Sequence, residues 1–383
     1  MKAIKREYHP WIYSTEISRI DGEFEEGQII DVFLSNGRFF GRGYINTKSK
    51  ITVRLLTTLP KTAEQIVEEG VENALRKREH ILKKEEACRL IFSESDWLAG
   101  LIVDKYGPYA VIQINTLGME RLKELIVKTL IDKFEVLGVY EKSDSSVRSK
   151  EGLEESCGWL YGSGPEVIFY RSGDLKLAAD LKGQKTGAFL DQRFNARALE
   201  PYADGKVCLD VFSYTGNFSL HLLKYGAKHV RLIDYSQRSL QIAEQLLKVN
   251  GFDGKYELIN ENAFDWLKRE STSQERYDLI VLDPPSFAKS SASKASAQRG
   301  HKEINLRAMK LLKKPGILVS SCCTQVLSET DFEQVLQDSA EDCKVQACIL
   351  YRGSQPADHP ILLGVPETRY LKFHIMSIWR RDQ

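Results

Sequence analysis

Short apolar runs alternate with amphipathic stretches over the C-terminal half of the chain, and this alternation constrains the fold more than any other feature. The apolar runs, which we expect to be strands, lie at residues 206–213, 229–236, 255–263, 277–283 and 317–323. Stretches with helical periodicity lie between them, at residues 216–227, 237–251, 264–271 and 305–316. Strands that alternate with helices form a parallel sheet with helices on both faces. We therefore predict a doubly wound α/β domain.

The expected strands end in acidic or amide residues, and in an open α/β sheet the ligand lies beyond the carboxyl ends of the strands. Asp210 ends the first strand, and Gly216 permits close backbone approach before a helix. The segment is not G-x-G-x-x-G, so an amino-acid tail fits better than a dinucleotide pyrophosphate. Asp234 can bond both hydroxyls of a ribose. Asn262 can bond an adenine edge while Phe264 packs on its face. Together they predict an S-adenosylmethionine site, with a nicotinamide cofactor as the alternative.

The fourth expected strand ends in Asp283, followed by Pro284 and Pro285. Proline has no N–H donor and fixes φ at about −65°, so this turn is stiff and poor in donors. The Asp283 carboxylate and the carbonyl groups of the turn can face a flat base that carries an amino group. Ser286 and Phe287 can add a wall and a stacking surface. The alternative is a rigid strand exit with a capping acid.

The N-terminal half has a different pattern. Residues 27–57 alternate β-rich runs with Asn-Gly and Gly-Arg-Gly breaks, which is typical of a small β-barrel. Residues 63–82 are expected to be helical, and a mixed pattern follows up to Arg171. Within it we expect a hairpin over 100–115, a helix over 120–134 and a strand over 136–144. Residues 289–300 are rich in serine and alanine, which predicts a mobile loop over the sheet edge.

The bulk composition excludes several classes of protein. With 383 residues, 42% hydrophobic and 28% charged, the chain is typical of a globular protein of two or three domains. A net charge of +1 means that a nucleic acid would have to meet a local basic patch. The seven cysteines form no C-x-x-C pair, so we expect no metal site and no disulfide framework. Reduced thiols, and the lack of a signal sequence or a long apolar run, predict a cytoplasmic protein with no membrane partner.

A series of segments, in order along the chain, resembles one known family. They are "HPWIYSTEI", "DWLAGLIVDKYG", "YEKSDSSVRSKEGL", "LKGQKTGAFLDQR", "CLDVFSYTGNFS", "DPPSF", "RGHKEIN" and "ADHPILLGVPETRYLK". Over nearly its whole length the chain resembles the PUA-domain-linked class I S-adenosylmethionine-dependent methyltransferases of large-subunit (23S) ribosomal RNA. The resemblance implies a PUA-like RNA-binding β-barrel at residues 1–75, a small α+β middle domain at 76–185 and a Rossmann-like methyltransferase domain at 186–383.

The resemblance also implies roles for individual residues. The cofactor residues it indicates are Asp210, Phe212, Tyr214, Gly216, Asp234, Asn262, Ala263 and Asp283. Relatives carry Asp at the position of Asn262, but an amide can still hydrogen-bond adenine. In relatives the segment at 181–193 lies next to the cofactor, which suggests Lys185, Thr186, Gln192 and Arg193 as further contacts. The alternative for that segment is a tight turn at Gly187 and a salt bridge that joins domains.

The choice of methylated atom depends on cysteine chemistry, since Asp-Pro-Pro occurs in both amino-methylating and cytosine-C5 enzymes. Carbon 5 of cytosine becomes nucleophilic only after a thiolate adds to C6, which needs a cysteine near the base. Aligned with the Ser-Cys-Ser block of the cytosine-C5 members, Cys323 takes the cysteine position and Cys322 replaces a serine. Neighbouring side chains on a strand point to opposite faces, so only one of the two should face the base. We predict Cys323 as the nucleophile, with Asp283 bonding the base edge; an inert cysteine pair is the alternative.

A basic and aromatic segment in the N-terminal domain is the expected RNA contact. Residues 38–54 contain Arg38, Arg42, Lys48, Lys50 and Arg54, interleaved with Phe39, Phe40 and Tyr44, and no acid. Such a surface suits phosphate contact and base stacking, although some of the aromatic side chains must be core. A target base would be flipped into the active site, where Pro284, Pro285 and Phe287 are the predicted base contacts. Arg299 and Lys302 are candidates for clamping the RNA backbone.

Three functions remain open from the sequence. The first is 5-methylcytosine formation in 23S ribosomal RNA, and the second is N7-guanine methylation of the same RNA. The third is an RNA-binding or ribosome assembly factor that holds S-adenosylmethionine without catalysis. The oligomeric state is also open, with a homodimer among the alternatives.

Overall fold

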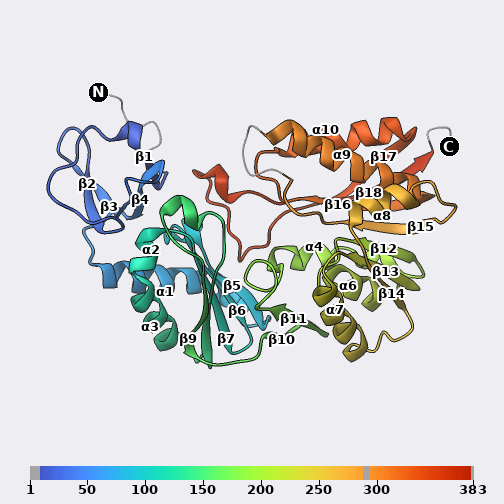
Figure 1. Cartoon of the computed structure of the whole chain (residues 1–383), viewed down its shortest axis with the longest axis horizontal. Coiled ribbons are helices and arrows are strands. Elements are labelled where there is room, and N and C mark those ends of the chain that lie inside the picture. The colour runs from blue at the N-terminus through green and yellow to red at the C-terminus, as the bar shows by residue number, and fades with distance from the viewer. Residues whose placement is uncertain (1–8, 288–292, 381–383) are drawn as a thin grey trace. The chain divides into compact units, whose positions relative to one another are not determined.

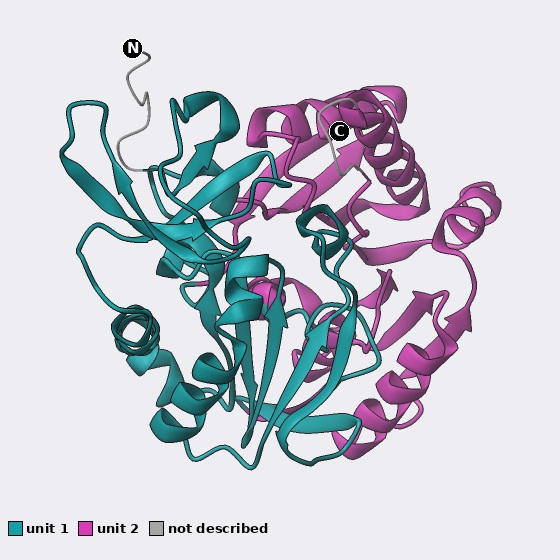
Figure 2. Cartoon of the chain, turned by 60° about the vertical axis from the view of Figure 1, so that its left-hand side comes forward, with its two compact units in different colours: residues 1–173, 179–190, 357–368 teal, residues 174–178, 191–356, 369–383 magenta. Residues whose placement is uncertain are grey.

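The computed structural model describes residues 9–287 and 293–380 (Figure 1). The chain divides into two compact units (Figure 2). Unit 1 consists of Met1–Gly173, Ala179–Leu190 and Ala357–Thr368, and unit 2 of Asp174–Ala178, Asp191–Pro356 and Arg369–Gln383. Each unit is therefore built from segments that are distant in sequence. No helix among the described residues is long and apolar enough to cross a membrane.

Unit 2 contains the predicted doubly wound sheet. Its strands are β12 (Val207–Val211), β13 (His229–Asp234), β14 (Tyr256–Asn260), β15 (Tyr277–Leu282), β16 (Leu312–Cys322), β17 (Val345–Gly353) and β18 (Lys372–Arg380). They run in the order β14-β13-β12-β15-β16-β18-β17. The five strands up to β16 are parallel, whereas β18 pairs antiparallel with both β16 and β17. The strand order reverses between β12 and β15, and the carboxyl side of such a switch point is where ligands bind.

Two short helices precede β12 in unit 2, and the other helices alternate with its strands. The helices are α4 (Arg193–Arg197), α5 (Glu200–Ala203), α6 (Asn217–Lys224), α7 (Gln237–Val249), α8 (Ala263–Glu270), α9 (Lys294–Leu311) and α10 (Glu329–Asp342). Apolar side chains from β12, β15, α8, α9 and α10 share one core cluster, which includes Leu209, Ile280, Trp266, Ile304 and Phe332. This packing confirms the predicted alternation of strands and helices.

Two predictions in this unit were wrong. The expected loop at 289–300 is helical from Lys294 onward, because α9 begins there; residues 289–292 of that prediction lie outside the described residues. Alanine favours helices, and Ala297 and Ile304 are both buried along α9, a periodicity hidden in a Ser/Ala-rich stretch. The strand expected from residue 317 begins five positions earlier, at Leu312, so the preceding helix ends at Leu311.

Unit 1 holds two sheets. The strands β1 (Trp11–Tyr13), β2 (Ile29–Phe33), β3 (Phe39–Ile45) and β4 (Ile51–Thr57) form an antiparallel sheet in the order β1-β4-β3-β2. A second sheet has the order β5-β6-β7-β8-β9, with β5 Ala87–Phe92, β6 Leu101–Tyr106, β7 Tyr109–Ile114, β8 Gly138–Ser143 and β9 Ser156–Gly162. Its helices are α1 (Ala63–Leu82), α2 (Leu117–Arg121) and α3 (Lys123–Lys133). The strands β10 (Val167–Ser172) and β11 (Leu175–Asp180) pair separately, and the division between the two units falls within β11.

The predicted helix at 63–82 and the hairpin over 100–115 are confirmed. Helix α1 crosses residue 75, where the sequence suggested a domain boundary. Tyr44 of β3 is buried among core residues of α1 and β5, and its hydroxyl donates to the Ala99 carbonyl at 2.9 Å. The first two expected domains thus share a core in unit 1, and the division into three domains stays a prediction.

Candidate active site

Asp210 lies at the carboxyl end of β12 and is fully buried. One of its oxygens, Oδ2, accepts the Ser219 N–H at 3.1 Å and the Ser219 hydroxyl at 2.6 Å. Burial raises the pKa of Asp210 to about 7, against the lowering effect of the Ser219 hydrogen bonds. Among the described residues, no group donates to the other oxygen, Oδ1. A buried carboxylate oxygen without a donor fits a ligand that brings its own, such as an ammonium group.

The loop between β12 and α6 has an unusual backbone. Phe212, Tyr214 and Gly216 all have positive φ, at 66°, 48° and 82°. For Phe212 and Tyr214 this left-handed conformation is strained, and such strain gathers at ligand sites. The Tyr214 N–H donates to Asp234 Oδ2 at 2.9 Å, and the Ser236 N–H donates to Asp234 Oδ1 at 2.8 Å. Asp234 thereby joins the ends of β12 and β13, and burial raises its pKa.

Asn262 and the aromatic residues near it lie at the end of β14. Asn262 caps α8, because its Oδ1 accepts the N–H groups of Phe264 at 2.9 Å and Asp265 at 3.4 Å. Its amide N–H group therefore faces away from the capping bonds and is the part that could meet an adenine. The Phe264 ring contacts the rings of Phe212 at 5.5 Å and Phe287 at 5.6 Å between centroids. Ala263 is buried in the core cluster against which Phe212 and Phe287 pack.

Asp283 immediately follows β15 and is held by two neighbouring side chains. Gln192 donates from Nε2 to Asp283 Oδ1 at 2.9 Å and to Ser321 Oγ at 3.1 Å. The Ser321 hydroxyl donates to the same Asp283 oxygen. Gln192 is itself oriented by Asn195, whose Nδ2 donates to Gln192 Oε1 at 2.7 Å. Because Gln192 and Ser321 are both almost fully buried, the Asp283 carboxylate has a fixed orientation at the end of the sheet.

Ser321 was not among the predicted site residues, although the two-residue periodicity of a strand indicated it. Residues two apart on a strand point to the same face. Since Cys323 was expected to face the base, Ser321 had to be on that face too. Its hydrogen bond to Asp283 agrees with this periodicity.

The two adjacent cysteines differ in environment, as the strand geometry predicted. Cys322 ends β16 and is fully buried in the core cluster, where burial raises its pKa. Cys323 is partly exposed, and its Sγ lies 3.9 Å from the Pro284 carbonyl oxygen. Lys372 donates to the carbonyl groups of Thr324 and Leu327, each at 2.8 Å, which fixes the segment that follows the strand. Cys323 is thus the cysteine beside the Asp-Pro-Pro turn.

The rest of that turn is anchored to helix α9. Pro284 is buried, whereas Pro285 is exposed. The Phe287 ring lies 4.5 Å from the His301 ring between centroids, and a Cβ added at Gly300 would lie 3.0 Å from Phe287. Phe287 therefore packs against protein groups, and its stacking on a target base stays a prediction.

Lys185 and Thr186 belong to unit 1, whereas Asp210 and the residues around it belong to unit 2. Thr186 is fully buried; it donates to Asp104, and its hydroxyl is 2.9 Å from the Tyr106 hydroxyl. The Lys185 ammonium lies 4.3 Å from the centre of the Phe189 ring. In unit 2, Arg193 is buried at the start of α4. The cofactor contacts expected of these residues stay predictions.

The basic segment of the N-terminal domain is smaller than the sequence suggested. Arg54 and Tyr44 are buried, and Arg54 forms an ion pair with Glu151 at 2.9 Å. Arg42 pairs with Asp31 and donates to the Lys61 carbonyl at 2.7 Å. Acids from outside residues 38–54 thus pair with two of the five cations, and Arg54 is buried; the RNA contacts expected of Arg38, Arg42 and Lys48 stay predictions. The exposed cations are Arg38, Lys48 and Lys50. On α9, Arg299 is exposed, while Lys302 pairs with Asp342 at 2.9 Å.

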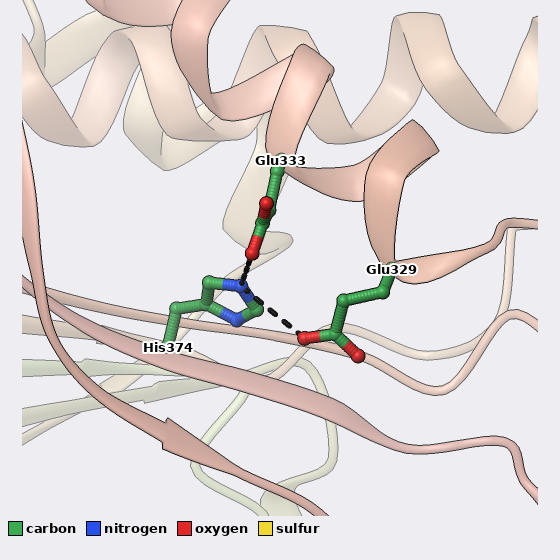
Figure 3. A group of neighbouring side chains, drawn as sticks. All are labelled: Glu329, Glu333 and His374. Atoms are coloured by element: carbon green, nitrogen blue, oxygen red, sulfur yellow. Dashed lines mark hydrogen bonds and ion pairs between the residues drawn. The ribbon is translucent and has the colours of Figure 1, made fainter.

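One cluster in unit 2 has spacing that could suit a metal ion, namely Glu329 and Glu333 of α10 with His374 of β18 (Figure 3). The His374 Nε2 lies 3.1 Å from Glu333 and 3.5 Å from Glu329. Metal-bound histidines donate their other N–H to an acceptor, but no described residue bonds Nδ1 of His374. Arg352 also donates to the same Glu333 oxygen at 2.9 Å. This cluster is better explained as a hydrogen-bonded contact between α10 and β18.

Comparison with known proteins identifies the class. Residues 2–58 match the family described as PUA-like domain, and residues 144–361 match the family described as S-adenosylmethionine-dependent methyltransferase. The chain belongs to this family of S-adenosylmethionine-dependent methyltransferases and carries a PUA-like domain at its N-terminal end.

Among its relatives are two proteins named Ribosomal RNA large subunit methyltransferase I. That of Aliivibrio fischeri is 36% identical, with 97% of this chain and 95% of the relative covered. That of Aeromonas hydrophila is 36% identical over 95% of this chain and 94% of the relative. The fold is shared with the crystal structure of SMU.776, described as a methyltransferase complexed with SAH, at a TM-score of 0.84 and 22% identity, covering 97% and 96% of the two chains.

These findings confirm the predicted fold class, the cofactor S-adenosylmethionine and methyltransferase activity. The unpartnered Asp210 oxygen, the strained loop and Asp234 are consistent with a cofactor that has an amino-acid tail and a ribose. The assignment of individual site residues, a homodimer and a cytoplasmic location stay predictions.

Proposed function

We propose that this protein methylates carbon 5 of a cytosine in large-subunit ribosomal RNA, with Cys323 as the nucleophile. The observation that carries the proposal is the contrast between its two adjacent thiols. Cys322 is packed in the core, while the Cys323 Sγ lies 3.9 Å from the Pro284 carbonyl oxygen, in the turn that starts with Asp283. The names of the relatives support large-subunit ribosomal RNA as the substrate, and the PUA-like domain agrees with an RNA partner.

The chemistry requires a nucleophile because carbon 5 of cytosine is too weakly nucleophilic to be methylated unaided. The Cys323 thiolate forms a bond to C6, and the electron pair of the C5–C6 double bond moves to C5. Asp283 hydrogen-bonds the base edge and supports protonation of the ring. Bound S-adenosylmethionine would supply an electrophilic methyl group, so that the electron pair at C5 forms the new C–C bond and S-adenosylhomocysteine leaves. A base then removes the C5 proton, the double bond re-forms and the S–C6 bond breaks, which releases the thiolate.

Several groups in unit 2 are placed to hold the cofactor in this proposal. The buried Asp210 oxygen would accept the ammonium group of the amino-acid tail, and Asp234 would accept the ribose hydroxyls. The Phe212 and Phe264 rings offer an aromatic surface, and the Asn262 amide offers a donor for the adenine. Gln192 holds Asp283 in one orientation, which is the role we now propose for it in place of a direct cofactor contact.

N7-guanine methylation of the same RNA is the competing activity, and it would need no nucleophilic cysteine. A factor that binds S-adenosylmethionine and RNA without catalysis is a second alternative. The position of Cys323 favours the cytosine product over both, because neither alternative gives a reason for a partly exposed thiol beside Pro284.

The test is nucleoside mass spectrometry of large-subunit ribosomal RNA from cells with and without the gene. We expect 5-methylcytosine to be lost without the gene and restored by the wild-type protein, but not by Cys323→Ala. Loss of 7-methylguanosine instead would support the guanine alternative. No change in any methylated nucleoside would support the factor without catalysis.

A further inference from the structure

A cavity of 580 Å³ lies within unit 1, and its lining includes none of the residues assigned above. It is lined by the end of β4 with the loop that follows, by residues of α1 and by the turn before β6. Its lining includes the apolar side chains of Leu56, Leu59, Ile66 and Trp97 and the polar ones of Thr57, Thr58 and Asn73. A cavity of this size takes a small organic molecule or one unit of a polymer. Its mixed lining suits a ligand with a flat apolar face and polar edges.

Trp97 is the most unusual residue of this cavity. It has φ 59° and ψ 20°, a left-handed conformation that strains a bulky side chain and that glycine would adopt freely. Its ring is partly buried against core residues of the first sheet and partly exposed to the cavity. Strain retained at a ligand-facing residue indicates a functional use of that side chain. An exposed indole face is a stacking platform for an aromatic ligand.

Among the charged residues of the lining, one cation has no ion-pair partner in the described part of the chain. Lys61 pairs with Glu69, and Lys77 pairs with Asp96 at 3.0 Å. Arg76 also lines the cavity from α1 and is exposed. No carboxylate of the described residues lies within ion-pair distance of it, although its charge contributes to the lowered pKa of Glu72, after the larger effect of Lys133. Because the lining has three cations and two acids, the cavity should attract an anion. The Arg76 guanidinium can form a bidentate contact with a phosphate.

We propose that this cavity binds one unpaired nucleotide of the RNA substrate, with its base stacked on Trp97 and its phosphate at Arg76. Thr57, Thr58 and Asn73 offer hydrogen bonds to the polar edge of the base. A base can enter only when it is unstacked, so the cavity selects single-stranded or looped RNA over a duplex. The inference rests on the proposed function, because it takes the nucleotide from the RNA that the enzyme methylates.

The experiment compares variants in the full-length protein. Trp97→Gly removes the ring and suits the left-handed backbone, whereas Trp97→Phe keeps an aromatic face. Arg76→Ala removes the unpaired cation, and Lys83→Ala is its control, since Lys83 is an exposed cation of the same chain region that pairs with Glu79 at 2.6 Å. Fluorescence anisotropy measures affinity for a short single-stranded RNA and for a duplex of the same sequence. Methylation of deproteinised large-subunit ribosomal RNA gives kcat and KM.

We expect Trp97→Gly to weaken binding of the single strand about tenfold and to raise KM similarly while kcat is unchanged, as loss of one stacked base predicts. Trp97→Phe and Lys83→Ala should bind within about twofold of the wild type, and Arg76→Ala should bind several-fold more weakly. Wild-type affinity in folded Trp97→Gly, or an equal loss on the duplex, would overturn the inference. If Trp97→Gly does not fold, the affinities of Arg76→Ala and Lys83→Ala for the single strand are compared instead. Equal affinities of these two variants would overturn the inference. A wild-type protein that binds RNA but methylates none overturns the proposed function and leaves the binding comparison intact.

Discussion

The Gln192 amide lies 2.9 Å from the Asp283 carboxylate, and the Ser321 hydroxyl donates to the same oxygen. These bonds hold the carboxylate at the end of β15 in one orientation. Both donors are neutral, and both bind the same oxygen of Asp283. The arrangement explains why a glutamine and a serine, neither of which carries chemistry of its own, are buried beside a candidate catalytic acid.

Gln192→Ala should lower the rate of methylation by about tenfold or more, because a hydrogen bond to a charged group contributes about 1.5–3 kcal/mol. The effect should appear in kcat, measured by transfer of labelled methyl groups to ribosomal RNA, with little change in cofactor affinity. Gln337→Ala is a matched control, since Gln337 bonds Glu341 on the exposed side of α10. A loss of cofactor affinity with kcat unchanged would instead show Gln192 to be a direct cofactor contact.

Cys323→Ala should abolish 5-methylcytosine formation while leaving cofactor binding intact, because it removes the only thiol beside the Asp-Pro-Pro turn among the described residues. Cys322→Ala should retain activity and lose about 1 kcal/mol of stability, because it opens a small cavity in the core. The two variants are compared by nucleoside mass spectrometry and thermal unfolding. Full activity in Cys323→Ala would rule out the covalent mechanism.

The pH dependence of cofactor binding should report Asp210, whose pKa burial raises to about 7. Below that value the carboxyl is protonated and cannot pair with an ammonium group, so affinity should fall as pH drops. Between pH 7 and pH 6 we expect up to about a tenfold rise in the Kd of S-adenosylhomocysteine, measured by calorimetry. Asp210→Asn should bind weakly at every pH and lose this dependence.

The same carboxyl should also make the ligand-free protein less stable as pH rises. The folded-state pKa lies above the unfolded value of 3.8, so the folded state binds more protons between the two values. Its stability therefore falls as pH rises through that window and levels off above about pH 7. Asp210→Asn should be more stable than the wild type above pH 7, by about 1 kcal/mol or more. Denaturant unfolding at pH 5 and pH 8 measures this, and equal differences at both values would contradict it.

Asp234→Ala should weaken S-adenosylhomocysteine binding by tenfold or more, since Asp234 is proposed to hold the ribose and also fixes the Tyr214 N–H. Asp253→Ala is the control, because Asp253 is an exposed acid of the same unit. Calorimetric titration compares the two. Wild-type affinity in Asp234→Ala would remove this residue from the cofactor site.

Substitution of Lys48 should change RNA binding, whereas substitution of Glu151 should change the stability of the fold. Lys48→Ala should weaken RNA binding and lower the salt slope by about one, with unchanged stability, because Lys48 is exposed. Glu151→Ala should cost about 3–5 kcal/mol of stability, because it leaves Arg54 buried without its ion-pair partner. Filter binding at several salt concentrations and thermal unfolding separate the two effects. A stability loss in Lys48→Ala would show that the basic segment is structural throughout.

Apart from the starts of α9 and β16, the sequence alone was sufficient to predict the helices and strands of unit 2 that surround the site. Strand and helix periodicity predicted the parallel sheet, and Asp210, Asp234 and Asp283 were expected at strand ends, where they lie. The alternation of side chains along a strand also predicted that Cys322 and Cys323 face different environments, as they do. These features are local, so a short stretch of chain contains all the information that they need.

Only the tertiary structure decided which groups meet. The contact between Gln192 and Asp283 spans 91 residues, and that between Arg54 and Glu151 spans 97. No local pattern encodes such pairs, so the sequence could neither predict the bond from Gln192 to Asp283 nor exclude Arg54 from the expected RNA contacts. The start of α9 was likewise decided by burial of Ala297 and Ile304, since a Ser/Ala-rich segment folds into a helix when it has a core to cover. Local periodicity thus determined the elements, whereas long-range packing and charge pairing determined which side chains form the site.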